Sequence, residues 1–403
     1  MPWSPADLMS IRLEFVAEAL GRRRAFATLC TQYGISEKTG YKWLARFRAA
    51  GPAGLADASH APHACPHQTP AAQRALLEAL RRVHPTWGAR KLRARLVVTH
   101  PALAWPAPST ITQLLDRAGL VRHRRRRSGG AGASAGGAEA EGRGPCPAPG
   151  PNALWTMDYK GQFRLGNGQW CYPLTVVDAA TRFLLACVAH PAPDTDAVRR
   201  VLTHCFQAYG LPQAMLSDNG PPFGAPRAPR GFSRLSCWLR TVGVTPRFIV
   251  PGHPEHNGRH ERLHRTLKAD VLHPPAPTLR AQQQRFDTFR TTYNTQRPHA
   301  ALALTPPATR FHPSGRPYVA PPRALAYPTH FLERRVTPAG LIWLHHAGIY
   351  VSQACTGITL GLDPVSSTRW DVYFAEYLLG TLDLSTLRFT ALAHTLTSPI
   401  NPV

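Results

Sequence analysis

Three acidic residues are the features of this sequence from which chemistry can be read most directly. Asp158 lies in Trp-Thr-Met-Asp-Tyr (155–159), Asp218 lies in Leu-Ser-Asp-Asn-Gly (216–220), and Glu261 follows an Asn-Gly pair at 257–258. Two aspartates at strand ends and a glutamate on a helix can hold two divalent ions, one activating the attacking oxygen and one stabilising the leaving oxygen at a phosphodiester. Carboxylates suit Mg²⁺ or Mn²⁺. The three acids therefore predict metal-dependent phosphodiester chemistry.

The composition of the chain points to a nucleic-acid partner. Its 403 residues include 47 Lys and Arg against 23 Asp and Glu, a net charge of +24. A charge of this sign favours polyanions, RNA as much as DNA. The length suggests roughly two or three domains. An acidic cluster inside so basic a chain predicts metal-dependent chemistry on nucleic acid.

Other partner classes find little support. The eight Cys residues form no Cys-x-x-Cys pair, which argues against a zinc ribbon or a disulfide framework. A group at His60, His63, Cys65 and His67 also lacks paired zinc-ligand spacing, and its Pro-punctuated segment reads as a connector. No apolar run reaches about 18 residues, and the N-terminus has no signal-peptide pattern. We expect a soluble intracellular protein with no membrane partner.

The first 58 residues have the pattern of a helix-turn-helix domain. A helix over 11–20 precedes a second from Phe26, a turn at Gly34, and an N-capping Ser36 that opens a third helix. Gly40 departs from the pattern, because an apolar residue is normally buried at its position. A plain helical hairpin is the alternative. The predicted DNA contacts of the third helix are Lys38, Tyr41, Lys42 and Arg46.

A second helical module is predicted over 70–127. Its three helical segments resemble a winged helix-turn-helix, with Ser109 capping the third segment, and it ends in a basic run. A Gly/Ala/Pro-rich linker follows over 128–150. A solvated basic tail is the alternative to DNA contact by the run. The arginines predicted to follow phosphates or enter a narrow minor groove are Arg124, Arg125, Arg126 and Arg127.

Short strands alternate with helices over 151–315. Asp158 falls on the first strand and Asp218 directly follows the fourth, and open α/β sheets bind ligands at strand ends. This order predicts a ribonuclease-H-like domain. Residues 325–390 are β-rich, as is typical of a small SH3-like barrel. The predicted fold is thus multidomain: N-terminal all-α helix-turn-helix modules, a central α/β core and a C-terminal small β barrel.

Four sequence frames, in order, carry a resemblance to a known family. They are Trp-x-x-Asp (155–158), Ser-Asp-Asn-Gly (217–220), Pro-x-x-Asn-Gly-x-x-Glu-Arg (254–262) and Tyr-Asn-x-x-Arg-Pro-His (293–299). The chain resembles bacterial insertion-sequence transposases of the retroviral-integrase (DDE) superfamily, strongly over 155–311, moderately in the helical modules and loosely in the β-rich end. The resemblance implies that Asp158, Asp218 and Glu261 are the catalytic residues and bind two Mg²⁺ or Mn²⁺ ions per active site.

Glu261 has a rival for the third position in Glu255. Many relatives place their second and third acids closer together, whereas 42 residues separate Asp218 from Glu261. The surplus falls in a Pro/Gly/Arg-rich loop over 221–234, which can lengthen without touching the sheet. Glu255 precedes the helix-opening Asn-Gly, while Glu261 lies one turn inside, where a helix holds it rigidly. Glu261 is the stronger candidate.

The helix that carries Glu261 is predicted to present two faces. Leu263, Leu267 and Val271 recur every four residues and should face the core. The other face would hold DNA phosphates beside Glu261, with a merely solvated basic face as the alternative; its predicted contacts are His264, Arg265 and Lys268. Asn219 would hydrogen-bond a phosphate or orient Asp218.

The resemblance implies a transposase. Metal-activated water would free a 3′-hydroxyl at each end of a mobile element, and that hydroxyl would attack a phosphodiester of target DNA. The helix-turn-helix modules would read the terminal inverted repeats in the major groove. Joining two ends implies a homodimer or higher oligomer on double-stranded DNA, in the cytoplasm and associated with the bacterial nucleoid.

Two other function classes stay open. One is a DNA-binding regulator derived from a transposase that has lost its chemistry, and the other is a ribonuclease-H-like nuclease that cuts without joining. The remaining conspicuous residues read as structural: Asp178 as the cap of a hairpin turn beside Arg182, Asp194 and Asp196 as helix caps, and Arg-Pro-His (297–299) as the end of the last core helix.

Overall fold

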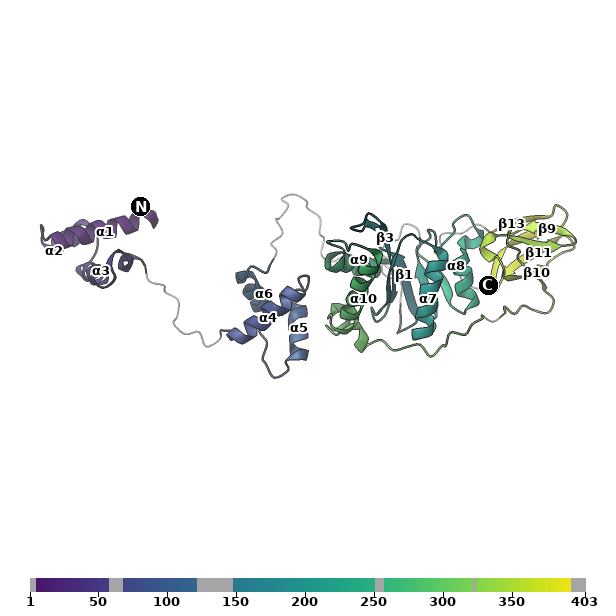
Figure 1. The fold of residues 1–403 in the computed structure, drawn as a ribbon, viewed down its shortest axis with the longest axis horizontal. Helices are drawn as coiled ribbons and strands as arrows, with labels where there is room; N and C mark the ends of the chain where they lie inside the picture. The colour runs from purple at the N-terminus through teal and green to yellow at the C-terminus, as the bar shows by residue number, and fades with distance from the viewer. Residues whose placement is uncertain (1–4, 58–67, 122–147, 251–256, 322–323, 393–403) are drawn as a thin grey trace. The chain divides into compact units, whose positions relative to one another are not determined.

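The computed structural model describes residues 5–57, 68–121, 148–250, 257–321 and 324–392 (Figure 1). The chain divides into two compact units, Met1–Thr69 and Pro70–Val403. Within the described ranges, every helix is too short or too polar to cross a membrane.

The first unit is a bundle of three helices closed by a short 3₁₀ helix. These elements are α1 (Pro5–Gly21), α2 (Phe26–Gln32), α3 (Glu37–Ala50) and the 3₁₀ helix η1 (Gly51–Leu55). Phe15, Leu29 and Trp43 are buried in its core. The Ser36 hydroxyl accepts a hydrogen bond from the backbone N–H of Thr39 at 3.3 Å, which confirms the predicted cap of α3. The predicted helix, turn and helix are all present.

The unexpected Gly40 is explained by its neighbours. Gly40 is buried in α3, and an added Cβ would lie 2.8 Å from the Cys30 Sγ and 2.9 Å from ring atoms of both Phe15 and Phe26. Real Cβ atoms do not approach other heavy atoms so closely. The two phenylalanine rings thus occupy the space that an apolar side chain at position 40 would fill.

The second helical module folds as predicted in outline and differs in detail. Its helices are α4 (Ala71–Val83), α5 (Ala89–Thr99) and α6 (Pro108–Arg117), which enclose Leu77, Trp87 and Leu96. The predicted cap at Ser109 is wrong, because α6 begins at Pro108, whose fixed φ suits a first helical position. No strand is present between residues 68 and 121, so the predicted wing is not found in this described segment.

A mixed β-sheet forms the centre of the second unit. Strand β1 pairs antiparallel with β3 and parallel with β5, β5 pairs parallel with β6, and β3 also pairs with β2 and β4. The strands are β1 (Leu154–Tyr159), β2 (Phe163–Arg164), β3 (Trp170–Asp178), β4 (Leu184–His190), β5 (Ala214–Ser217) and β6 (Thr245–Phe248). Strands and helices alternate as predicted, except that Asp218 follows the fifth strand, β5, and not the fourth, because β2 is an additional short strand.

Two pairs of helices cover opposite faces of this sheet (Figure 1). Trp155 and Met157 of β1 face α7 and α8 in one apolar cluster. Val177 and Leu184 face α9 and α10 in another. Since side chains alternate along a strand, Thr156 and Asp158 lie on the α9 side. The helices are α7 (Thr195–Tyr209), α8 (Arg234–Thr241), α9 (Gly258–Val271) and α10 (Leu279–Thr295).

Several predicted structural roles are confirmed. The carboxylate of Asp178 accepts hydrogen bonds from the backbone N–H groups of Asn152 and Thr181, each at 2.7 Å, and closes the β3–β4 turn. The Asp194 side chain caps α7 by accepting from the Ala197 N–H at 2.7 Å. Arg297 is buried just beyond α10 and donates to Asp270 on α9 at 3.0 Å.

The C-terminal residues form an open antiparallel sheet and a separate hairpin. The strand order of the sheet is β13–β12–β11–β10–β7, and β8 pairs with β9. The β-rich content is confirmed, but the described strands do not close, so the SH3-like barrel stays a prediction. The strands are β7 (Leu332–Arg335), β8 (Leu341–Leu344), β9 (Ala347–Tyr350), β10 (Thr359–Pro364), β11 (Arg369–Phe374), β12 (Tyr377–Asp383) and β13 (Arg388–Ala391).

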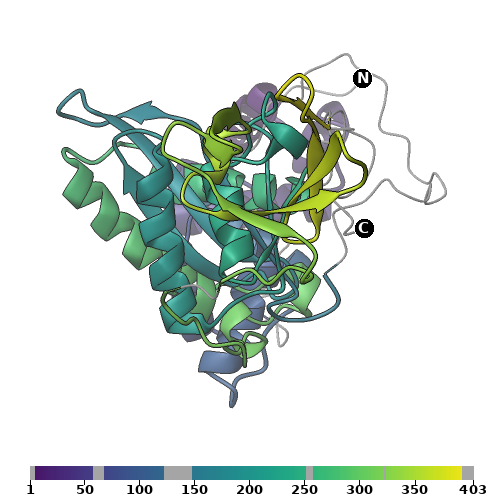
Figure 2. The ribbon, with the colours of Figure 1, turned by 90° about the vertical axis from the view of Figure 1, so that its right-hand side faces the viewer.

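The C-terminal strands, yellow-green in Figures 1 and 2, share an apolar cluster with α8 and with the loop that precedes it. Phe232 packs edge-on against Phe374 and Tyr377, with ring centroids 5.7 and 5.3 Å apart. The Arg230 Nε donates to the Leu378 carbonyl at 2.7 Å. The 221–234 loop, predicted to lengthen without touching the core sheet, contacts the C-terminal sheet, which the sequence did not indicate.

Candidate active site

Asp158 and Asp218 are brought together by the pairing of two parallel strands. Thr156 of β1 lies opposite Leu216 of β5, and each aspartate follows its strand partner by two residues. The two carboxylates therefore leave neighbouring strands at the same level, with the same side-chain parity. This is the edge of the sheet at which the sequence placed the site.

The surroundings of this pair disfavour its ionised form more than they favour it. Burial and then the negative charge of Asp218 raise the pKa of Asp158 to about 7, although the Asn257 side-chain amide, donating at 2.9 Å, partly offsets this. Burial of part of its carboxyl also raises the pKa of Asp218, which is otherwise exposed to solvent. A divalent cation would remove the repulsion that raises the pKa of Asp158. The two hard oxygen donors therefore fit Mg²⁺ or Mn²⁺.

Glu261 stands apart from this pair. It lies in the first turn of α9 and is exposed, together with Arg265 and Lys268 on the same face. Among the described residues, no three Asp, Glu, His or Cys side chains are grouped closely enough to hold a metal ion. The rival Glu255 lies outside the described residues. The structure thus brings together two of the three predicted ligands.

The prediction that His264 binds DNA is wrong. His264 is only 7% exposed, and burial, followed by the charges of His260 and Lys160, lowers its pKa to about 2. A neutral, buried imidazole cannot attract phosphates from solvent. The buried face of α9 consists of His260, Leu263, His264 and Leu267, so His264 belongs to the core stripe. The predicted core positions Leu263 and Leu267 are confirmed.

Four polar residues near the aspartates were not predicted. Asn257, the N-cap residue of α9, donates to the Asp158 carboxylate, and His260 contacts both Thr156 and Thr175. Asn257 belongs to the Asn-Gly frame at 257–258, which signalled a role without specifying it. Nothing in the sequence marks the two threonines, because their partners lie far away along the chain.

Asn219 serves the loop after β5. Its side-chain amide donates to the Ile249 carbonyl at 2.7 Å, just beyond β6. That bond fixes the backbone beside Asp218 and engages the amide nitrogen, so the structure favours the orienting role over phosphate binding.

The predicted DNA-binding residues of α3 divide into two groups. Lys38, Tyr41 and Lys42 are exposed on one face, as major-groove contacts require. Arg46 is half-buried, with its guanidinium 5.3 Å from the centroid of the Trp43 ring, where it supports the domain. The arginines at 124–127 and the His/Cys group at 60–67 lie outside the described residues.

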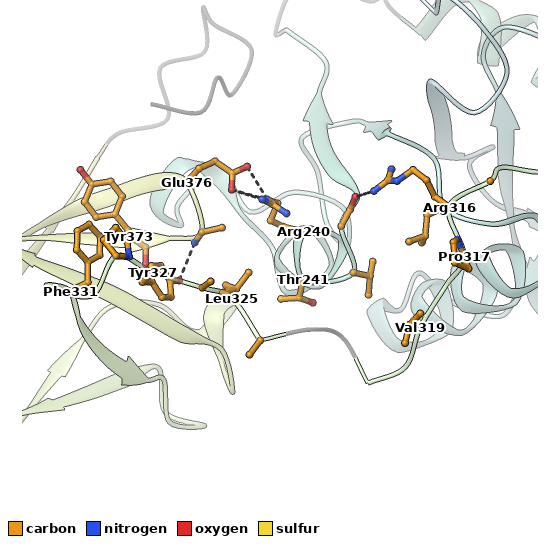
Figure 3. Close-up of a pocket in the computed structure, with 18 residues that line it drawn as sticks. Arg240, Thr241, Arg316, Pro317, Val319, Leu325, Tyr327, Phe331, Tyr373 and Glu376 are labelled. Atoms are coloured by element: carbon orange, nitrogen blue, oxygen red, sulfur yellow. Dashed lines mark hydrogen bonds and ion pairs between the residues drawn. The ribbon is translucent and has the colours of Figure 1, made fainter.

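A cavity of about 920 Å³ lies elsewhere, between α8 and the C-terminal sheet (Figure 3). Arg240 of α8 and Glu376 form a bidentate ion pair at its edge, with the shortest contact 2.6 Å. The aromatic rings of Tyr327, Phe331 and Tyr373 line its other side. None of the three predicted catalytic acids lines this cavity, so it is separate from the site.

Known protein families match most of the chain outside the C-terminal sheet. Integrase core domain models match residues 148–254 and 242–307. A helix-turn-helix domain model matches 11–63, and a homeodomain-like domain model matches 39–115. The integrase match covers β1 to α10 and includes Asp158, Asp218 and Glu261.

The curated relatives include proteins of bacterial insertion elements. A 31.7 kDa protein of insertion element IS407 from Burkholderia multivorans is 30% identical over 158 residues, which are 39% of this chain and 54% of that protein. A protein of IS476 from Xanthomonas euvesicatoria is 31% identical over 160 residues, 39% of this chain and 43% of that protein. The chain thus spans about half the length of these relatives.

Solved structures that match include retroviral integrase cores. The HTLV-2 integrase catalytic core in complex with magnesium is 14% identical and has a TM-score of 0.33, with 41% of this chain and all of that chain covered. The BIV integrase core is 21% identical, with a TM-score of 0.30 over 39% and 92% of the two chains. TM-scores this low add no weight to an assignment, which rests on the two integrase core matches and the insertion-element relatives. Residues 148–307 of this chain thus match the integrase core domain family, and the chain is similar to proteins of bacterial insertion elements.

Proposed function

We propose that this chain is the transposase of an insertion element. It binds the terminal inverted repeats of the element, cleaves their 3′ ends in a Mg²⁺-dependent reaction and joins them to target DNA. The observation that carries the proposal is the repelling carboxylate pair of Asp158 and Asp218 at adjacent strand ends of an integrase core domain.

Asp158, Asp218 and Glu261 would hold the divalent ions. Bound there, the ions supply activation of the attacking oxygen and stabilisation of the leaving oxygen at phosphorus. Asn257 orients the Asp158 carboxylate through its 2.9 Å hydrogen bond. Arg265 and Lys268, exposed on the same face of α9 as Glu261, hold DNA phosphates beside the site.

Recognition of the element ends is assigned to the N-terminal unit. Lys38, Tyr41 and Lys42 form one exposed face of α3, and a helix-turn-helix domain model matches this region. Lysines on such a helix neutralise phosphates and tyrosine reaches base edges. Because two element ends must be joined to one target, the active species contains at least two copies of the chain.

Cleavage and strand transfer on labelled duplexes carrying the DNA that flanks the gene test this function. With Mg²⁺ or Mn²⁺, wild type yields joined products. Asp158→Asn, Asp218→Asn and Glu261→Gln each lower the rate at least about a hundredfold, equivalent to about 2.7 kcal/mol of barrier. Asp196→Asn is the matched control, because Asp196 is exposed in the first turn of α7 and remote from the strand-end pair in sequence.

Three results would change this assignment. Specific binding without cleavage by any of the proteins would leave a DNA-binding regulator. Nicked DNA that is never joined would indicate a nuclease. Cleavage by Glu261→Gln at the wild-type rate would remove Glu261 from the metal site.

A further inference from the structure

A single buried hydroxyl connects strand β3 to the strand and the helix that carry two of the proposed metal ligands. Thr175 is 0% exposed and lies opposite Asp158 in the β1–β3 ladder. Its Oγ1 lies 3.1 Å from the Asp158 carbonyl oxygen, 2.6 Å from the His260 Nε2 and 2.8 Å from the His264 Nε2.

One arrangement of protons satisfies the four contacts of this network that are 3.1 Å or shorter, and it leaves unmade only the 3.5 Å contact from the Thr156 hydroxyl to the Val177 carbonyl. The Thr175 hydroxyl donates to the Asp158 carbonyl and accepts from the Nε2–H groups of His260 and His264. The Nδ1 of His260 then accepts from the Thr156 hydroxyl, 2.8 Å away. The Nδ1 of His264 is left without a proton, 3.9 Å from the Asp158 Oδ2, which is too far for a hydrogen bond.

Packing of the core alone does not require polar side chains at these positions. Four polar side chains lie in the network, with exposed fractions of 0% for Thr175, 1% for His260, 6% for Thr156 and 7% for His264. Burying polar groups costs free energy unless each one is bonded, so leucines would pack here at lower cost. Leucines, however, would not fix how α9 is oriented relative to the sheet, whereas hydrogen bonds fix both a distance and an angle.

These bonds fix the orientation of the first turns of α9 relative to strand β3. His260 precedes Glu261 directly and His264 follows it by three residues, so both bonded imidazoles hold the turn that carries Glu261. At the start of the same turn, Asn257 is bonded to the Asp158 carboxylate. The buried Thr175 hydroxyl, bonded to both the Asp158 backbone and α9, thus fixes the position of Glu261 relative to Asp158.

We propose that Thr175, with His260 and His264, is a positioning device that sets where Glu261 stands relative to Asp158, and so sets the affinity of the site for divalent metal. The proposal rests on the proposed function, in which Glu261 is a metal ligand. Thr175 itself touches neither metal nor DNA.

The test measures Mn²⁺ binding to the full chain by titration calorimetry, beside the free energy of unfolding in urea. Thr175→Val keeps the shape and removes the hydroxyl, and we expect it to weaken Mn²⁺ binding at least tenfold. Thr175→Ser restores the hydroxyl and should restore binding to within about threefold. His264→Gln, which offers an amide N–H near the position of the Nε2, provides a second variant if Thr175→Val does not fold.

Tyr159→Phe is the matched control. It removes another hydroxyl–imidazole bond, 2.9 Å from the Tyr159 hydroxyl to the His190 Nδ1, in the same sheet. Tyr159 lies on the neighbouring strand β1, on the face that packs against α7 and α8. We expect it to lower stability and to leave Mn²⁺ affinity unchanged. Equal weakening by Tyr159→Phe and Thr175→Val would mean that the network only stabilises the fold, and the proposal would be lost.

A double-mutant cycle with Glu261→Gln separates positioning from general damage. If Thr175 acts through Glu261, Thr175→Val weakens Mn²⁺ binding little once Glu261 is already Gln. Additive losses would overturn the proposal. Wild-type protein that binds Mn²⁺ without joining DNA would defeat the proposed function and leave the cycle readable. Glu261→Gln with wild-type Mn²⁺ affinity would overturn the positioning proposal and remove Glu261 from the metal site.

Discussion

Two carboxylates on neighbouring parallel strands repel each other unless a positive charge lies between them. In this chain the repulsion is visible in Asp158, whose pKa is raised to about 7 by burial and by Asp218. A carboxyl with a raised pKa makes its full contribution to stability below its unfolded value of 3.8 and loses it as the pH rises through its folded value. The folded protein therefore carries an electrostatic cost at neutral pH that a bound cation would relieve.

Asp158→Asn should therefore stabilise the metal-free protein at pH 8 and do so less at pH 5. The rise of the Asp158 pKa from 3.8 to about 7 corresponds to about 4 kcal/mol as an upper limit. The measurement is the difference in urea unfolding free energy between variant and wild type across this range. Comparing variant with wild type is necessary because buried histidines also make stability depend on pH, in the opposite direction. Burial lowers the pKa of His260 to about 3, so the protein loses the stability contributed by neutral His260 as the pH falls below about 6.5.

Added Mn²⁺ provides the complementary measurement. It should stabilise wild type more at pH 8 than at pH 5 and should have little effect on Asp158→Asn. A variant no more stable than wild type at pH 8 would show that the Asp158 charge is already compensated.

At the scale of single elements, α3 shows how close packing replaces an expected side chain. Gly40 leaves room for the rings of Phe15 and Phe26, which approach α3 more closely than any Cβ would permit. The exposed face of the same helix keeps Lys38, Tyr41 and Lys42 available to DNA. In α3, a glycine on the buried face thus allows close packing, and the lysines on the exposed face are available to bind DNA.

Gly40→Ala should destabilise the N-terminal unit by about 1–3 kcal/mol, because overpacking outweighs the gain in helix propensity. The measurement is urea unfolding of Met1–Thr69, which forms a compact unit. Gly21→Ala is the control, since a Cβ at the last residue of α1 would meet nothing within 4 Å. Equal stability of the two variants would mean that Phe15 and Phe26 shift at no cost.

Most elements of the core were predictable because local signals agreed with the fold. The alternation of strands and helices placed Asp158 and Asp218 at one edge of the sheet, where β1 and β5 end. His264 was misjudged because histidine at a helical spacing reads as polar surface. Only the partner Thr175, 89 residues away, shows that it is buried and bonded. Long-range hydrogen bonds of this kind leave no local pattern.

At the scale of the whole molecule, the integrase core and the C-terminal sheet share one apolar cluster. Phe232 and Cys237, both almost fully buried, come from the loop and helix that follow the second aspartate, and their neighbours come from β10 to β12. Arg240 and Glu376 add an ion pair across the same junction. The two parts should therefore unfold together.

Phe232→Ala in the full chain should lower stability by about 3–5 kcal/mol, as expected for emptying a buried phenylalanine site. Amide hydrogen exchange should accelerate in both α8 and β12, because the lost contacts belong to both. The control is Trp343→Ala on β8, which is 56% exposed and should change stability by less than about 0.5 kcal/mol. Acceleration in β12 alone would show that the parts open separately.

The attachment of the C-terminal sheet through Arg230 and Phe232 constrains how this lineage can change. Both residues lie in the 221–234 loop, between the second and third acids. A deletion that shortened this loop would leave the catalytic frames intact and remove the anchor of strands β7 to β13, residues 332–391. Loop length and C-terminal sheet should therefore be inherited together, and relatives with the shorter loop should anchor their last strands elsewhere or lack them.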